Sequence, residues 1–115
     1  MKPKILIPLY GSQVAPRFDL STEVIVVNLG ETLPGKREKI LVLPHASPDE
    51  LCRLILTEKV DVVICGGIEE EYFQYLSWKR VQVIDSVIGS SKSAIQHYRN
   101  GKLLAGAILP ANTID

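Results

Sequence analysis

The stretch VDVVIC, at positions 60–65, is apolar at every position except one. A strand that alternates apolar and polar residues can leave one face in water, whereas a nearly continuous apolar run must be covered on both faces. Gly66, Gly67 and Ile68 follow, and then three consecutive glutamates that can begin a helix. A strand buried on both faces and followed by a helix is typical of α/β proteins, so this stretch predicts a sheet between layers of helices.

The rest of the chain supplies further strands and helices of the same kind. Ser47, Pro48 and Glu50 form a capping box with proline at the first helical position, which predicts a helix start. Leu51, Leu54 and Ile55 then share one helical face. Other helices are expected from about Glu69 and from Ser90 or Ser91 to Asn100. Other strands are expected at 4–9, 23–29, 40–44 and 81–85.

These elements follow one another in the order β-β-β-α-β-α-β-α. Short connections between the first three strands favour antiparallel neighbours, and the later strands alternate with helices, as parallel crossovers require. The sequence therefore predicts a three-layer α/β/α fold around a mixed five-stranded sheet. We expect a single domain over residues 1–115.

Composition and charge exclude several classes of function. The 115 residues are 46% hydrophobic and 23% charged, and 13 basic residues balance 13 acidic ones. A nucleic-acid-binding protein would usually carry a basic excess, so that class is not expected. No apolar stretch approaches the ~20 residues that span a bilayer, and Cys52 and Cys65 fit no zinc or disulfide spacing. These features favour a cytoplasmic protein.

The Gly66-Gly67 pair invites a phosphate-site interpretation, which the flanking residues do not support. Neither G-x-G-x-x-G nor a glycine-lysine-serine ending is present. Glu69, Glu70 and Glu71 already supply the negative charge that a helix start attracts. The glycines are thus expected to serve a tight turn or a close approach to the backbone.

The loop YGSQVAPRFDL, at 10–20, allows two interpretations. In one it is a surface connection with Phe18 folded back as a plug. In the other it is a recognition loop that places Arg17 and Asp19 beside a ligand. Long loops in compact domains are often functional, and the sequence alone leaves both interpretations open.

Several motifs taken in order resemble one family. They are the strand KILIP, a loop with P-x-F, the strand followed by Gly-Gly-Ile, and a final helix of the form A-x-x-x-Y-x-x-G-K-L. Together they cover about residues 3–104 and resemble the dinitrogenase iron-molybdenum cofactor biosynthesis family, the nitrogenase accessory factors with domains like NifX and the C-terminal part of NifB. The resemblance implies a ribonuclease H-like motif with strand order 3-2-1-4-5 and an antiparallel second strand.

The resemblance also implies a site. Members of the family are small carriers of iron-molybdenum or iron-sulfur cofactors or of their precursors. The first and fourth strands would lie side by side, and ligands tend to bind at such a switch point. The loop and the glycine turn would then bound a crevice in which backbone N–H groups at Gly67 and Ile68 could donate to an anion. The cofactor-binding residues implied are Arg17, Phe18, Cys65, Gly66, Gly67 and Ile68.

Cys65 is the one direct metal ligand expected there, although a small buried hydrophobic residue is the interpretation that its position favours. The sequence departs from the family at two places: Arg17 stands where members usually have histidine, and Glu69 where glycine often follows Gly-Gly-Ile. Arginine does not ligate metals at neutral pH. The leading hypothesis is a non-catalytic carrier of a metal cofactor. The alternative is a protein interaction or regulatory domain of the same fold that has lost the cofactor.

No catalytic set emerges, because Asp19, Asp61 and Asp85 are scattered and both histidines lie away from any nucleophile. We therefore expect no enzyme activity. The aromatic helix at 69–79 carries four aromatic residues, too many for one inward stripe. Some of these aromatic residues are therefore expected to face a partner, such as a second copy of the chain. The family resemblance implies a client or cluster-assembly protein as a further partner.

Overall fold

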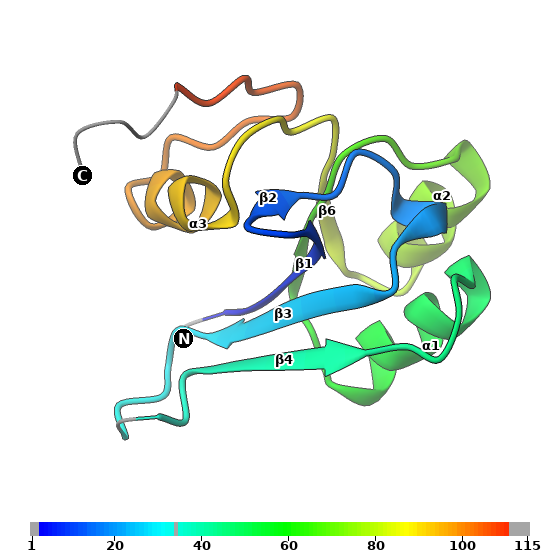
Figure 1. The fold of residues 1–115 in the computed structure, drawn as a ribbon, viewed down its shortest axis with the longest axis horizontal. Coiled ribbons are helices and arrows are strands. Elements are labelled where there is room, and N and C mark those ends of the chain that lie inside the picture. Colours follow the sequence, from blue (N-terminus) through cyan, green and yellow to red (C-terminus); the bar gives the residue numbers. More distant parts are fainter. Residues whose placement is uncertain (1–2, 34, 111–115) are drawn as a thin grey trace.

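A computed structural model describes residues 3–33 and 35–110 of the chain. Helices cover both faces of one mixed sheet (Figure 1). The elements, in chain order, are β1 Lys4–Tyr10, β2 Gln13–Val14, the 3-10 helix η1 Phe18–Leu20, β3 Glu23–Asn28, β4 Glu38–Val42, α1 Pro48–Thr57, β5 Val62–Ile64, α2 Glu70–Trp78, β6 Gln82–Ile84 and α3 Ser91–Arg99.

The sheet has six strands in the described residues rather than the five expected. The additional strand is β2, whose two residues pair with the end of β1, and it was missed because two residues give no periodic signal. The other strands lie in the order β4-β3-β1-β5-β6. Because β2 counts as a strand, each strand after β1 carries a number one higher than in the expected order 3-2-1-4-5. As predicted for residues 23–29, β3 is antiparallel to both of its neighbours, with Ile25 opposite Ile7 and Ile40.

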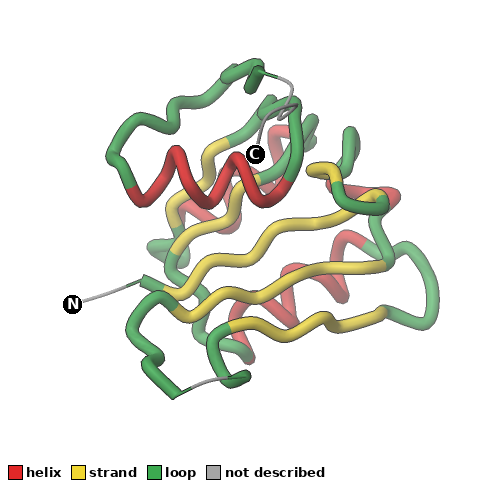
Figure 2. The backbone as a smooth tube through the Cα atoms, turned by 60° about the vertical axis from the view of Figure 1, so that its left-hand side comes forward, coloured by secondary structure: helices red, strands yellow, loops and turns green. Residues whose placement is uncertain are grey.

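Strand β1 separates two hydrophobic cores because its side chains alternate between the faces of the sheet. Ile5, Ile7 and Leu9 contribute to the core beneath α3, whereas Leu6 contributes to the core beneath α1 and α2. Figure 2 shows the helices on opposite sides of the strands. All three residues of β5 are buried, which confirms that the apolar stretch at 60–65 is covered on both faces.

The helices begin where their caps predict. The Ser47 Oγ accepts a hydrogen bond from the Glu50 backbone N–H at 3.2 Å, and the Ser90 Oγ accepts one from the Ser93 N–H at 3.0 Å. Along α2, Leu76 is buried and Tyr75 is 39% exposed, so the aromatic residues do not share one inward stripe, as the sequence predicts. Among the helices of the described residues, none is long and apolar enough to span a bilayer.

Candidate functional site

The site expected from the sequence lies where the chain leaves β1 and β5. These strands are parallel neighbours, with Ile5 opposite Val62 and Leu6 opposite Val63. Their carboxyl ends therefore lie together, and the segments that follow them meet in space. The structure brings the loop at 10–20 and the turn at 65–68 into contact, as the sequence analysis expected.

The loop lies directly on the glycine turn, with no open crevice between their backbones. The Phe18 N–H donates to the Gly67 carbonyl at 2.8 Å, and the Gly67 N–H donates to the Pro16 carbonyl at 2.8 Å. Arg17 and Gly67 accordingly form a parallel bridge. The Gly67 amide that was expected to be free for an anion is already occupied by the loop.

Gly66 is required by this contact rather than by its backbone conformation. A Cβ at position 66 would overlap the Ala15 carbonyl oxygen and lie 2.6 Å from that of Pro16. Since real Cβ atoms do not approach oxygen so closely, any other residue would push the loop away. The glycine therefore makes room for the opposite loop.

Phe18 is the plug of the first interpretation of the loop. Its side chain is 1% exposed, and its ring centroid lies 6.2 Å from that of Tyr72 on α2. Ser21 is also buried, and its hydroxyl donates to the Arg17 carbonyl at 2.7 Å. The core beneath α1 and α2 thus includes the loop, which holds η1 against the end of the sheet.

Arg17 is turned toward its own loop. Its Nε donates to the Asp19 Oδ1 at 3.0 Å and its Nη2 donates to the Oδ2 at 2.7 Å. A guanidinium binds the carboxylate or phosphate of a ligand through the same pair of hydrogen bonds. The pair with Asp19 offsets the charge of Arg17 and leaves the other N–H groups of the guanidinium, on Nη1 and Nη2, for an external anion.

Cys65 is fully buried between the sheet and α2. Burial, with a smaller effect from the nearby Asp85 carboxylate, raises the pKa of its thiol to about 12. Metals bind the thiolate, and a thiol with this pKa is protonated at neutral pH. Ile68, the last of the expected site residues, is half-buried against the same core.

The remaining ligand-type residues do not gather around Cys65. Within residues 3–33 and 35–110, no group of three or more His, Cys, Asp or Glu side chains is placed to hold a metal ion. Cys52 is buried on α1, and burial followed by the charge of Asp49 raises the pKa of its thiol to about 11. His97 lies on α3, where its Nδ1 is 2.9 Å from the Ser93 carbonyl oxygen. The residues at this end of the sheet therefore do not fit an iron-sulfur or iron-molybdenum cluster.

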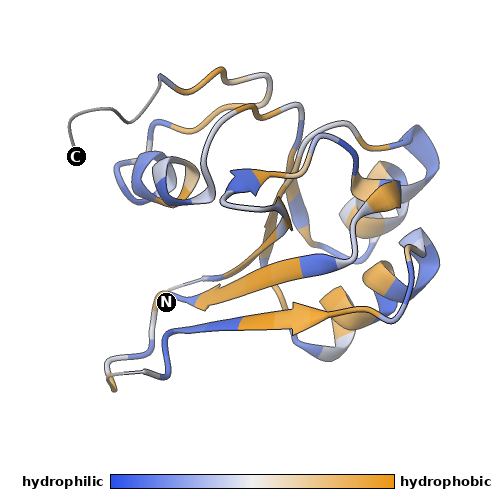
Figure 3. Ribbon diagram, viewed as in Figure 1, coloured by the Kyte–Doolittle hydropathy of each residue, from blue (hydrophilic) through white to orange (hydrophobic). Residues whose placement is uncertain are grey.

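Charge, which sums to zero over the sequence, is separated in space. Helices α1, α2 and α3 all begin at the carboxyl end of β1, and the first turns of α1 and α2 are acidic. Figure 3 shows these first turns as hydrophilic segments at the end of the molecule. The acidic residues of this end are Asp19, Glu23, Asp49, Glu50, Glu69, Glu70, Glu71 and Asp85.

The opposite end, where the helices finish, carries most of the basic residues. Only a few acids lie among them, and one of these, Glu58, is bridged by Lys39 at 2.8 Å and Lys4 at 3.4 Å. The basic residues of this end are Lys4, Lys36, Arg37, Lys39, Lys59, Lys79, Arg80, Arg99 and Lys102. The molecule is thus polarised along its strands, a property that the sequence analysis missed because it depends on which strand ends meet.

A groove lies between α1 and α2 and is lined along α1 from Asp49 in its first turn to Thr57 at its end. It has a volume of about 490 Å³, and the charged residues that line it are Asp49, Arg53 and Glu71. Tyr72 and Tyr75 line it from α2. Desolvation, followed by the charges of Asp49, Glu71 and Glu69, raises the pKa of Tyr72. Such a groove can accept an apolar side chain and a cationic group together.

Solved structures share this fold. No family model matches the chain, and no curated protein matches it. The crystal structure of a protein designated PH0822 has a TM-score of 0.75 at 20% sequence identity, over 89% of this chain and 93% of that one. A Thermotoga protein provisionally named a NifB protein, of the DUF35 family, has a TM-score of 0.69 at 17% identity, over 94% and 97%.

A Methanocaldococcus jannaschii protein provisionally named a dinitrogenase adds a third match. Its TM-score is 0.66 at 20% identity, over 90% of this chain and 93% of that one. At such identities the likeness is one of fold. The resemblance to the cofactor biosynthesis family that the sequence motifs indicate is therefore confirmed at the level of the fold.

Proposed function

We propose that this chain is a non-catalytic interaction domain of the nitrogenase accessory fold, with the ribonuclease H-like arrangement of that family and a role in the cytoplasm. The observation that carries this proposal is the closure of the switch point by the chain's own loop. Gly67 is hydrogen-bonded through both its N–H and its carbonyl, and Phe18 fills the space behind it. We therefore expect a partner at this end of the sheet to bind on the surface of the protein rather than in a crevice at the switch point.

The partner that fits this surface is a basic segment of another protein. Glu69, Glu70 and Glu71 are exposed beside the groove between α1 and α2. Acidic side chains steer a cationic partner toward the groove, and tyrosine rings favour cations at their faces. The aromatic end of α2 already holds a cation in this way, because the Lys79 Nζ lies 4.9 Å from the centroid of the Trp78 ring.

Carriage of a metal cofactor is the second candidate. It is supported by the provisional names of the Thermotoga and Methanocaldococcus proteins, which associate the fold with nitrogenase and suggest a nitrogenase-related process for this chain. The cofactor would be cargo, and it would have to open the loop from Gly67 before reaching Cys65. Because the Cys65 thiol is buried and Arg17 is paired with Asp19, we consider the cofactor carrier less well supported than the interaction domain.

Titration with a short amphipathic lysine-rich peptide, followed by the fluorescence of Trp78, tests the proposal. We expect saturable binding that weakens as salt is added. Glu71→Lys should weaken binding several-fold because it reverses a charge on the rim of the groove. Glu38→Lys, a matched reversal of an exposed charge on β4, should leave binding unchanged.

The two candidates separate in a second titration. Iron-sulfur or iron-molybdenum cofactor is added anaerobically to the wild type, Arg17→Ala and Cys65→Ala, and the visible absorption spectrum is recorded. The interaction domain should give no stoichiometric spectrum with any of the three proteins. A stoichiometric cofactor on the wild type that is lost in Cys65→Ala would establish the carrier instead. Peptide binding that is equally sensitive to Glu38→Lys would reject the proposed surface.

A further inference from the structure

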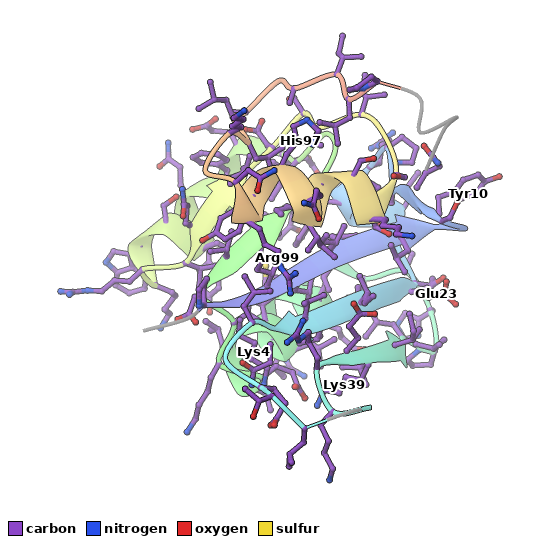
Figure 4. The ribbon with its side chains drawn as sticks, turned by 90° about the vertical axis from the view of Figure 1, so that its left-hand side faces the viewer. Lys4, Tyr10, Glu23, Lys39, His97 and Arg99 are labelled. Atoms are coloured by element: carbon purple, nitrogen blue, oxygen red, sulfur yellow. The ribbon has the colours of Figure 1, made fainter. Side chains whose placement is uncertain are left out.

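Two arginines share the walls of adjoining cavities at the basic end of the molecule. The larger cavity, of about 750 Å³, lies between the end of α3 and the start of β6, and Arg37 and Arg99 line it. Its neighbour, of about 360 Å³, lies between α3 and β3 and has the same two arginines in its wall. In Figure 4 Arg99 extends from α3 toward the strands. The 750 Å³ volume is within the range of small-molecule sites.

Neither arginine forms an ion pair within the part of the chain that the structure describes, and the one acidic residue that lines either cavity is Glu38, in the wall of the smaller one. The ion pairs there are Lys4–Glu58, Arg17–Asp19 and Lys39–Glu58. Arg37 donates from its Nε to the Glu31 carbonyl at 3.3 Å, and this contact leaves its terminal nitrogens to other acceptors. Since a guanidinium is always charged, two of them on one cavity attract an anion that can lie between them.

The remaining wall of the larger cavity sets the kind of anion. Gln82 and Tyr98 add neutral hydrogen-bonding groups, and Leu29, Ile84 and Leu103 add apolar surface. Desolvation, followed by the charge of Asp61, raises the pKa of Tyr98. Like any tyrosine hydroxyl at neutral pH, that of Tyr98 is protonated and can donate to an oxyanion.

We propose that the cavity between Arg37 and Arg99 binds a small organic oxyanion, a phosphate or carboxylate joined to an apolar or aromatic group. The guanidinium groups would pair with the oxyanion. Arginine does this better than lysine because its planar fork can donate two parallel hydrogen bonds to one carboxylate or phosphate. The apolar part would lie against Leu29 and Ile84. This site is at the opposite end of the sheet from the closed switch point and is independent of the proposed partner surface.

The site assembles segments that are distant in the sequence. Leu29 and Arg37 flank the connection between β3 and β4, Gln82 begins β6, and Tyr98 and Leu103 flank the end of α3. The Lys102 N–H donates to the His97 carbonyl at 2.9 Å, which fixes the chain as it turns past Gly101. The cavity is thus formed by anchored backbone on several sides, as a preformed site requires.

Isothermal titration with four probes tests the site: phenyl phosphate, benzoate, inorganic phosphate and benzyl alcohol. The wild type should bind phenyl phosphate or benzoate with a saturable isotherm, more tightly than inorganic phosphate, and should not bind the neutral alcohol. The stronger of the two aromatic anions identifies phosphate or carboxylate as the ligand group. Arg37→Gln and Arg99→Gln should each weaken that binding by at least about tenfold, because each removes a charged fork from the anion.

Two further variants make the result specific. Arg53→Gln removes the same charge from α1, on the opposite face of the sheet, and should leave binding unchanged. Arg99→Lys keeps the positive charge and most of the aliphatic stem, so it should fold normally and still weaken binding. The proposal is overturned if the wild type shows no saturable binding at millimolar concentrations. Equal loss in Arg53→Gln would also overturn it, because nonspecific charge would then explain the binding.

Discussion

Gly66 lies where two backbone segments that are fifty residues apart in the sequence come within contact distance. The segment at 15–16 passes over it, so that the position has no room for a side chain. The pair Arg17–Asp19 and the buried ring of Phe18 then hold the loop in that place. At the scale of single residues, the end of the sheet is shaped by contacts within the chain.

Gly66→Ala should destabilise the fold by about 1–3 kcal/mol, the usual range for an overpacked buried position. The cause is the overlap of the new Cβ with the Ala15 and Pro16 carbonyl oxygens. Urea unfolding followed by circular dichroism measures the change. Gly67→Ala is the matched control, because a Cβ at 67 would lie 3.4 Å from the nearest atom, the Pro16 oxygen. Equal losses in the two variants would contradict this account of the turn.

The sequence pattern predicts where α1 and α2 lie along the chain, but the two helices differ in how much apolar surface they expose. Helix α1 buries Leu51 and Ile55, as its sequence pattern predicts. Helix α2 buries Leu76 but leaves Trp78 75% exposed. The aromatic residues of α2 exceed what one buried stripe can hold, so the helix presents an apolar surface near its end.

We expect this surface of α2 to mediate self-association, because an exposed tryptophan gains contact area when it is covered. Sedimentation velocity across a concentration series should show a concentration-dependent increase for the wild type. Trp78→Ala should abolish the increase, and Phe73→Ala should reduce it. Tyr10→Ala is the control, since Tyr10 is equally exposed but lies at the end of β1. A wild type that stays monomeric at every concentration would reject the prediction.

At the scale of the whole molecule, the fold buries Cys65 at the carboxyl end of β5 and separates the charges between the two ends of the sheet. Cys65 directly follows β5, and its backbone N–H and carbonyl are bonded to Ile84 and Val87 at 3.0 Å. The thiol can be reached only if the strands and the loop over them separate. Its reactivity therefore reports the opening of the fold.

In a Cys52→Ala background, Cys65 should react with iodoacetamide at least about a thousandfold more slowly in the folded protein than in urea-unfolded protein. The rate should rise with urea along the same slope as global unfolding. Mass spectrometry of quenched samples measures it. Labelling that is fast and independent of urea would instead indicate that the loop at 10–20 opens locally, and such opening would favour the carrier over the interaction domain.

The sequence determined the elements of this protein and their layers. Apolar runs, helical periods and the caps at Ser47 and Ser90 act over a few residues, so they could be interpreted locally. The short strand β2 was missed because it forms only by pairing with β1. That the aromatic residues of α2 are too many for one inward stripe was expected from the sequence, but which of them lie outward, Tyr75 and Trp78, depends on what packs against the helix.

The candidate site divides in the same way. Its residues were named from the sequence, and the meeting of the loop with the glycine turn was expected from the order of strands. The burial of Cys65 was the interpretation that its sequence position favoured. Only the tertiary structure decided that the loop occupies Gly67, that the pKa of the Cys65 thiol is raised, and that the charges separate. The cavity between Arg37 and Arg99 likewise depends on tertiary packing. Each of these properties joins residues far apart in the chain, and the distances between such residues are set by the packing of whole elements rather than by any local pattern.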